Sequence, residues 1–350
     1  MKTTISLILS IGFYSATVFS QDIHFSQFYM SPLTLNPGMA GANYSLEALV
    51  NFKDQWRGIS VPYTTLAASI DGRLNKKKNK SSYLSGGLNF FRDKAGDAKM
   101  GIAQGNFTLA YHLSIAKYQT IGVGLQGGYA QRSINYDSLH WASQYDPVNG
   151  YNPAIPSGEP SMSAFSYSDA GAGIVWTFNN TAGLVHVEDN HDLRANLGIA
   201  VFHAYQKYSF YKTSDEKLYP KYVFHGNALI SFPNYHNIAF VPGFVFFRQG
   251  PAQEIIAGSL IRFKFRQESK YTNVKKDASF NLGGYYRIKD AIIVSFLIEL
   301  SSYAIGISYD LNASKLTSAS NGRGGVELSI RYIAPNLFQK NVLKDFKNGP

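Results

Sequence analysis

The sequence predicts an all-β fold, namely a closed, transmembrane antiparallel β-barrel of about 14 strands. Many segments alternate apolar residues with small or polar ones at a period of two, as strands with one apolar face do. After residue 20, no run approaches the ~20 consecutive apolar residues that a membrane-spanning helix needs. Charged residues make up only 16% of the chain, below the ~25% that is usual in soluble domains. An ordinary soluble enzyme would carry more charge.

The alternation is clear between residues 103 and 130. The residues expected on one apolar face are Ala103, Gly105, Phe107, Leu109, Tyr111 and Leu113, followed in the next segment by Ile121, Val123, Leu125, Gly127 and Tyr129. The residues between them are mostly small or polar, and successive side chains of a strand point to opposite faces. Fourteen segments are predicted as strands: 45–52, 62–71, 82–92, 101–114, 118–131, 168–178, 193–204, 220–232, 235–248, 253–265, 278–288, 290–300, 302–312 and 324–333.

Two features favour a membrane barrel over a soluble β-sandwich, which is the alternative fold. Tyrosines stand near strand ends on the apolar faces, as with Tyr111, Tyr129, Tyr309 and Tyr332. Outer-membrane barrels carry such aromatic girdles at both interfaces. The opposite faces are rich in Gly, Ala, Ser and Asn, which suit a wet lumen better than a soluble exterior.

Residues 1–20 are predicted to be a secretory signal peptide. Lys2 is the only charged residue, an apolar stretch follows, and Val18 and Ser20 precede a cleavage point at Gln21. A retained N-terminal helix is the alternative. Export together with the absence of Cys indicates a Gram-negative envelope, and we expect an outer-membrane protein.

The rest of the chain divides into three parts. Residues 21–44 are an N-terminal periplasmic or plug segment, residues 45–333 form the barrel, and residues 334–350 are a periplasmic C-terminal tail. The longest connection runs from Arg132 to about Tyr167, and we place it outside the cell because long outer loops and shorter inner turns are usual in such barrels.

The composition excludes several classes of protein. With 45% hydrophobic residues and no Cys, the chain is neither disordered nor a disulfide scaffold, and it has no Cys nucleophile or Cys-ligated metal. The net charge of +10 rests on few clusters, chiefly Lys76–Lys78 with Lys80. For an exported chain, lipopolysaccharide phosphates or an acidic protein partner are better candidates than nucleic acid. A solvated lysine-rich turn is the simpler interpretation of the cluster, and we favour it.

No pattern predicts catalysis. The eight His residues lack the i, i+4 spacing of a helical zinc motif. His186 and His191, with Glu188 and Asp189, could hold a cation, although a solvated turn is the simpler interpretation. No G-x-S-x-G elbow, phosphate loop or dinucleotide fingerprint is present. We therefore expect no enzyme activity, no catalytic residue, no metal site and no cofactor.

The segment DIHFSQFYMSPLTLNPGMAG, residues 22–41, has no clear period. It mixes aromatic side chains with polar ones and two prolines, and a free tail would not need so many aromatics. Three arrangements fit: a plug in the barrel lumen, a segment that packs against a periplasmic partner, and a simple lead-in strand.

This block also carries a resemblance to a known family. The matching residues are Asp22, Ile23, His24, Phe25, Ser26, Gln27, Phe28, Tyr29, Leu35, Asn36, Pro37, Ala40, Gly41, Gln55, Trp56, Arg57 and Pro62, with Asp93–Gly96, Pro242-Gly243, Gly306–Asp310 and Gly325–Ser329 in the same order later. The chain resembles the PorP/SprF family of outer-membrane proteins, which is associated with the type IX secretion system of Bacteroidota. The resemblance covers nearly all of the chain after residue 20.

The resemblance implies a non-enzymatic role. Family members assist secretion of, or hold at the cell surface, proteins that bear a type IX C-terminal domain, such as gliding adhesins. Some interact with periplasmic components that link the membrane to the secretion motor or to peptidoglycan. Partner-binding residues are then expected within the motif, at Asp22, His24, Phe25, Ser26, Gln27, Phe28, Tyr29, Asn36, Pro37, Gln55 and Trp56. A porin-like channel for small solutes is the alternative function, because small polar inward faces would allow one.

Overall fold

The computed structural model describes residues 22–57, 61–75, 82–96, 98–146, 148–158, 164–180, 193–204, 218–232, 235–266, 278–314 and 317–334. Several predictions lie outside these residues: the signal peptide, the lysine cluster at 76–80, the His186 and His191 pair, and nearly all of the C-terminal tail. Among the described residues, no helix has the length and apolar character needed to cross a membrane.

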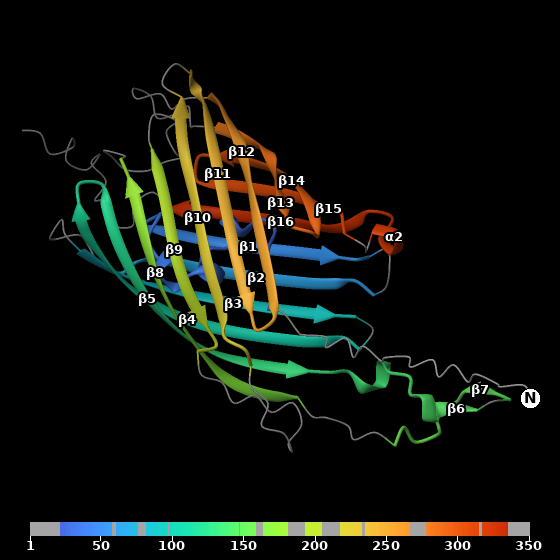
Figure 1. The fold of residues 1–350 in the computed structure, drawn as a ribbon. Helices are drawn as coiled ribbons and strands as arrows, with labels where there is room; N and C mark the ends of the chain where they lie inside the picture. The colour runs from blue at the N-terminus through green and yellow to red at the C-terminus, as the bar shows by residue number, and fades with distance from the viewer. Residues whose placement is uncertain are drawn as a thin grey trace, which may run out of the picture.

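Fourteen antiparallel strands close into a barrel, so the predicted fold class and strand number are confirmed (Figure 1). Each predicted segment overlaps one strand. The barrel strands are β1 (Leu46–Gln55), β2 (Tyr63–Arg73), β3 (Ser82–Ala95), β4 (Met100–Ala116), β5 (Gln119–Ser133), β8 (Phe165–Asn179), β9 (Arg194–Phe202), β10 (Lys221–Phe232), β11 (Tyr235–Gln249), β12 (Ala252–Arg266), β13 (Ala278–Arg287), β14 (Ala291–Leu300), β15 (Tyr303–Asn312) and β16 (Arg323–Ala334).

The barrel closes because β1 pairs with β2 on one side and with β16 on the other. Leu46 lies opposite Gly72 of β2 and opposite Ala334 of β16. Closure leaves no strand edge with unpaired backbone groups, which lipid would not tolerate. We call the end at which β1 begins and β16 ends the inner end, and the opposite end the outer end.

The long connections lie at the outer end. Consecutive barrel strands run in opposite directions, so residues 134–164 and 203–220 both join strands at the end opposite to the start of β1. The first of these contains the 3-10 helices η3 (Tyr136–Ser138) and η4 (Ala142–Gln144) and the hairpin of β6 (Tyr145–Asp146) and β7 (Gly150–Tyr151). The hairpin projects well beyond the barrel rim (Figure 1). A short helix, α2 (Thr317–Ser320), joins β15 to β16 at the same end.

The predicted alternation decides which side chains face outward. On β4, Phe107, Leu109 and Tyr111 are exposed on the outer face, whereas Thr108 and His112 are buried inside. Exposed and buried side chains also alternate along most of β5, β15 and β16. Tyr129 and Tyr309 lie toward the outer end of their strands and Tyr111 and Tyr332 toward the inner end, so both rims carry aromatic rings, as at membrane interfaces.

Residues 22–44 lie inside the barrel. They contain three short helical turns, η1 (Phe28–Met30), α1 (Pro32–Leu35) and η2 (Pro37–Met39), and therefore do not form the lead-in strand that the sequence also allowed. Phe25, Phe28, Met30 and Leu33 are almost completely buried. We call residues 22–44 the plug. Its apolar side chains supply the core that an empty lumen would lack.

Candidate functional site: the plug and its seat in the lumen

The plug runs through the lumen from the outer end to the inner end. At its start, the backbone N–H of Asp22 donates to Gln249 Oε1, 3.0 Å away, at the last residue of β11. Near its end, the N–H of Gly41 donates to Asp71 Oδ2 at 2.7 Å, close to the end of β2. Because β11 ends at the outer rim and β2 ends at the inner rim, the plug spans the barrel.

A charge cluster holds the first plug residue at the outer rim. His203 lies between two carboxylates: its Nε2 is 2.5 Å from Asp22 Oδ2 and its Nδ1 is 2.9 Å from Asp169 Oδ2. Lys221 Nζ is 3.8 Å from the same Asp22 oxygen. Burial disfavours the charged form of His203, but the carboxylates of Asp22 and Asp169 outweigh it and raise the pKa to about 9.

The same cluster keeps Asp22 ionised. Burial acts to raise the pKa of Asp22, but the charges of His203 and Lys221 outweigh it and hold that pKa well below its usual range. At neutral pH the pair is therefore a carboxylate and an imidazolium. The opposite charges fasten the start of the plug to the ends of β9 and β10.

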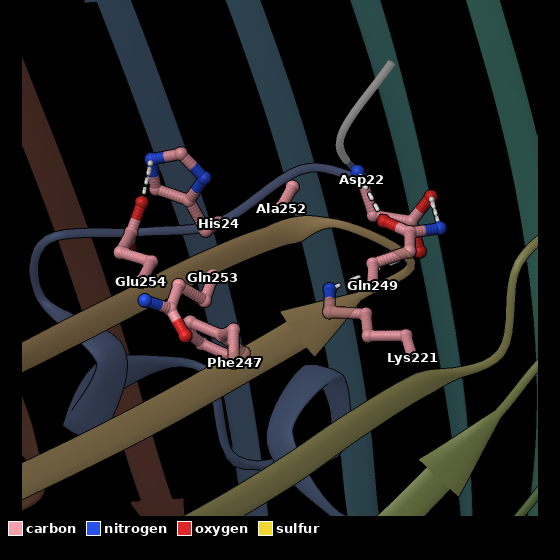
Figure 2. Close-up of a pocket in the computed structure, with 8 residues that line it drawn as sticks. All are labelled: Asp22, His24, Lys221, Phe247, Gln249, Ala252, Gln253 and Glu254. Atoms are coloured by element: carbon pink, nitrogen blue, oxygen red, sulfur yellow. Dashed lines mark hydrogen bonds and ion pairs between the residues drawn. The ribbon is translucent and has the colours of Figure 1, made fainter. Parts of the chain in front are cut away.

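Next to this cluster, His24 faces β12 across a small pocket at the outer end. Figure 2 shows the His24 ring directed at Glu254, and Asp22 beside Gln249. His24 Nε2 lies 3.4 Å from Glu254 Oε2. Burial and the nearby positive charge of Lys53 lower the pKa of His24, so the ring is neutral.

Ser26 and Gln27 are held by one carboxylate of the barrel wall. The Ser26 N–H donates to Glu327 Oε1 at 2.7 Å and the Gln27 N–H donates to Glu327 Oε2 at 3.0 Å. Lys53 Nζ lies 3.0 Å from the same Glu327 side chain, and both charged groups are at most 2% exposed. Glu327 therefore joins the plug backbone to a buried ion pair between β1 and β16.

The Ser26 hydroxyl makes a second set of contacts with the wall. It donates to Asp310 Oδ2 at 2.8 Å and accepts from Arg287 at 2.5 Å. Arg287 Nη2 also lies 2.9 Å from Asp310 Oδ2, so the serine sits on a buried ion pair between β13 and β15. A serine suits this position because its small side chain can both donate and accept.

The next plug residues pack by their rings. Phe28 contacts Tyr29 and Tyr285 edge-to-face, with ring centroids 5.7 Å and 5.3 Å apart. The Phe28 side chain is buried in the largest apolar cluster, together with Val245 and Ile256 of β11 and β12. The aromatic pair of the predicted motif therefore acts as a hydrophobic anchor for the plug.

Asn36 fixes the turn between α1 and η2. Its Nδ2 lies 2.9 Å from Ile174 O, 3.1 Å from Ile199 O and 3.2 Å from His225 Nε2. Its Oδ1 accepts from the N–H of Gly38 at 2.8 Å, which caps η2. A single amide thus contacts three wall strands, β8, β9 and β10, and the plug itself. Pro37 follows at the first residue of η2, where its missing N–H costs nothing.

Glycines of the wall make room for this turn. A Cβ on Gly124 would overlap the backbone of Pro37, and one on Gly173 would overlap the Asn36 side chain. A Cβ on Gly306 of β15 would overlap the Gln27 side chain. The inward glycines therefore form a groove shaped to the plug, in agreement with the role of strand glycines at close backbone approaches.

The predicted partner-binding residues lie in two parts of the structure. Asp22, His24, Phe25, Ser26, Gln27, Phe28, Tyr29, Asn36 and Pro37 are all in the plug. Gln55 and Trp56 lie at the outer end of β1, where the Trp56 N–H donates to Gly324 O and its ring contacts Tyr63. Partner binding by any of these residues stays a prediction. Phe25, Ser26, Gln27 and Phe28 could touch a partner only if the plug left the lumen, because they are buried.

The carboxylates and the arginine that seat the plug were not among the predicted site residues. Glu327, Asp310 and Arg287 stand on strands, and the pattern shows only that Glu327 and Asp310 face the lumen. A usable signal is a lone charge at an inward position whose neighbours on the same face are Gly and Ser. Such a charge requires a partner, because a buried unpaired charge is very costly.

The contacts at this site are noncovalent and hold the plug in place. Among the described residues, no group of three or more His, Asp or Glu side chains is placed to hold a metal ion. The absence of catalytic residues, metals and cofactors remains an expectation from the sequence.

Comparison with known proteins identifies the family. A family model described as "Type IX secretion system membrane protein PorP/SprF" matches residues 17–332. No curated protein is detectably similar in sequence.

Three solved structures are similar to parts of this chain. BamA from Haemophilus ducreyi lacking POTRA domains 1-3 is 8% identical with a TM-score of 0.42, over 83% of this chain and 70% of that one. The CymD monoaromatic hydrocarbon channel is 9% identical with a TM-score of 0.42, over 88% and 93%. CdiB from Acinetobacter baumannii is 10% identical with a TM-score of 0.38, over 82% of this chain and 60% of that one, so the chain spans less than two thirds of CdiB. Only the family match bears on function.

Proposed function

Because the chain belongs to the PorP/SprF family of type IX secretion system membrane proteins, we propose that it assists secretion of, or anchors at the cell surface, proteins that bear a type IX C-terminal domain. A closed β-barrel in this family points to the outer membrane. We propose further that the membrane is that of a Gram-negative bacterium, that the inner end faces the periplasm, and that gliding adhesins are among the cargo.

The observation that carries this proposal is the seated plug. A solute channel needs a continuous wet path, whereas here the lumen holds a chain segment fixed by buried charges, a multiply bonded asparagine and an aromatic anchor. A barrel filled in this way supports binding of a protein at its rims better than conduction. The long connections at the outer end supply surface for such a partner.

The proposed partners follow from the two rims. At the outer end, the partner is the C-terminal domain of a secreted protein. At the inner end, it is a periplasmic component that links to the secretion motor or to peptidoglycan. The outer face contacts lipid and, at the outer rim, lipopolysaccharide. We propose no nucleic acid partner, no cofactor and no enzyme activity.

Deletion of residues 22–29 tests the role of the plug. The barrel should still fold, seen as heat-modifiable migration on a gel, while surface display of the cargo is lost. A matched deletion of residues 148–151, which removes part of the turn and strand β7 of the β6–β7 hairpin, serves as a second variant that leaves the plug intact. Normal display after loss of residues 22–29 would contradict the proposal.

The porin-like alternative is tested by conductance. The purified chain in liposomes should give no steady current, because the plug occupies the lumen. A steady open pore in the full chain would favour the channel and overturn the anchor.

A further inference from the structure

The plug leaves part of the lumen open at the inner end. A vestibule of about 950 Å³, counting the part open to solvent, lies between the plug and the wall formed by β8–β14 and β16. Tyr29 of the plug and Tyr285 of β13 limit it toward the outer end, with ring centroids 5.8 Å apart. Its volume is in the range of pockets that hold ligands.

The charged side chains that line the vestibule already have partners in the protein. Arg331 Nη2 lies 2.8 Å from Glu299 Oε1, and Arg331 Nε faces Glu47. Arg262 Nη2 lies 3.2 Å from the other Glu299 oxygen, and Arg194 has a partner as well. A charged ligand would have to compete for groups that are already paired, and it would lose its own hydration on entry. The lining therefore suits an uncharged ligand.

Two facing asparagines of the lining leave one acceptor and one donor unused. Asn196 of β9 lies directly opposite Asn227 of β10, and Asn196 Nδ2 donates to Asn227 Oδ1 at 2.5 Å. Asn196 is only 8% exposed, yet its Oδ1 has no hydrogen-bond partner among the described residues. Within that part of the chain, Asn227 Nδ2 has none either. Because buried polar atoms are nearly always hydrogen-bonded, the pair indicates a ligand that both donates and accepts.

Further neutral polar groups surround this pair. Asn281 of β13 donates its amide hydrogens to two wall acceptors, which leaves its Oδ1 to accept. Thr177 of β8 lies directly opposite Asn196 on the other side, and its hydroxyl, which donates to a backbone carbonyl of β5, can still accept. Asn43, half-buried, adds an amide from the plug. The hydrogen-bonding groups thus come from four strands and the plug, and they fit a ligand that carries such groups on several sides.

The neighbouring arc of the wall is apolar. It consists of side chains on β10, β11, β12 and β14, namely Leu229, Val241, Leu260 and Leu297. A sugar ring has the matching division, because its hydroxyl groups lie around its edge and its C–H groups lie on its faces. An extended peptide carries its N–H and C=O groups in one plane, so it would leave the amides on either side of that plane unpaired. The lining therefore favours a saccharide over a peptide.

We propose that the vestibule binds an uncharged saccharide, which enters from the inner end. The Asn196–Asn227 pair and Asn281 hydrogen-bond its hydroxyl groups, and the apolar arc packs against a face of its ring. A hydroxyl suits the pair because a single group both donates and accepts. Saccharide binding goes beyond the proposed function and depends on it only for the compartment that the inner end faces.

The test is a calorimetric titration of the full chain in lauryl dimethylamine oxide, a detergent without a sugar headgroup that could compete. The ligand is chitotriose, an uncharged trisaccharide. We expect saturable binding with the same affinity at low and high salt, since salt screens only charges. An uncharged peptide of Ser and Gly should bind at least about tenfold more weakly. Chitohexaose separates two sources of the saccharide: equal affinity assigns the site to the end of a longer glycan, and loss of binding assigns it to a free short oligosaccharide.

Four variants locate the site. Asn196→Ala and Asn227→Ala should each weaken chitotriose binding about three- to tenfold, as expected for the loss of one or two hydrogen bonds. Asn43→Trp places a large ring in the vestibule from the plug side and should abolish binding without a change in the wall. Asn149→Ala, in the exposed turn between β6 and β7 at the outer end, is the matched control and should leave binding unchanged. If a wall variant gives no heat-modifiable band, Asn43→Trp carries the test.

Three outcomes would overturn the proposal: no saturable binding of chitotriose, equal or tighter binding of the peptide, which would make the vestibule a peptide site, or equal affinity in Asn43→Trp and Asn149→Ala, which would place the saccharide elsewhere. The titration involves no secreted protein, so its failure leaves the proposed function standing. Normal cargo display in a strain that lacks this chain would remove the proposed function and leave saccharide binding intact.

Discussion

Glu327 gives the sharpest test of how the plug is held. Its carboxylate accepts two backbone N–H bonds from the plug and one ion pair from Lys53. In Glu327→Gln, one oxygen becomes an NH₂ group that faces a donor, and the buried ammonium of Lys53 loses its counter-charge. Removing one member of a buried ion pair costs about 3–5 kcal/mol.

Part of that cost falls on the docked plug. Once the plug has left the lumen, its N–H groups bond to water in both the unchanged chain and the variant. The variant therefore loses the two bonds to a charged group, worth about 1.5–3 kcal/mol each, only in the docked state. Since every 1.4 kcal/mol is about tenfold, a loss of 3 kcal/mol or more raises the undocked population by about two orders of magnitude.

The assay is single-channel recording in planar bilayers. The unchanged chain should be closed, and Glu327→Gln should show frequent openings. Glu299→Gln is the matched control because Glu299 is also buried but forms its ion pairs with the wall residues Arg262 and Arg331. It should weaken the barrel without opening it. Closed recordings for a folded Glu327→Gln barrel would refute the view that this carboxylate retains the plug.

Three further predictions concern the seat and the outer rim. Gly124→Ala should release the plug, measured as protease cleavage within residues 22–44, because the added Cβ meets plug backbone, whereas Gly127→Ala should not, because that Cβ meets nothing within 4 Å; equal cleavage of both would contradict the groove. Asn36→Ala should lower stability by about 1–3 kcal/mol, read as a lower temperature for loss of the heat-modifiable band, and an unchanged temperature would show that its bonds are replaced by water. The His203 pKa is raised from 6.5 to about 9, so its stabilisation is complete below pH 6.5 and is lost as the pH rises through about 9, while the lowered pKa of Asp22 means that its stabilisation is present above pH 3.8 and is lost in acid. Amide protection of residues 22–28, corrected for intrinsic exchange, should therefore fall between pH 7 and pH 10, and constant protection would exclude this role of His203.

The sequence by itself determined the barrel. Period-two alternation specifies both the strand and the face that meets lipid, because a strand shifted by one residue would turn its whole apolar set toward the lumen. Phe107, Leu109 and Tyr111 show this directly, since their exposure on β4 follows from spacing alone. Closure follows too, because an open edge cannot exist in lipid.

The tertiary structure alone decided what the lumen contains. Residues 22–44 have no period, so nothing in their spacing separates a plug from a segment bound to a partner. Their position depends on contacts between residues far apart in the chain, such as Ser26 with Glu327 and Asn36 with Ile174. A local pattern records which way a side chain points, whereas only the closed barrel brings the distant groups together.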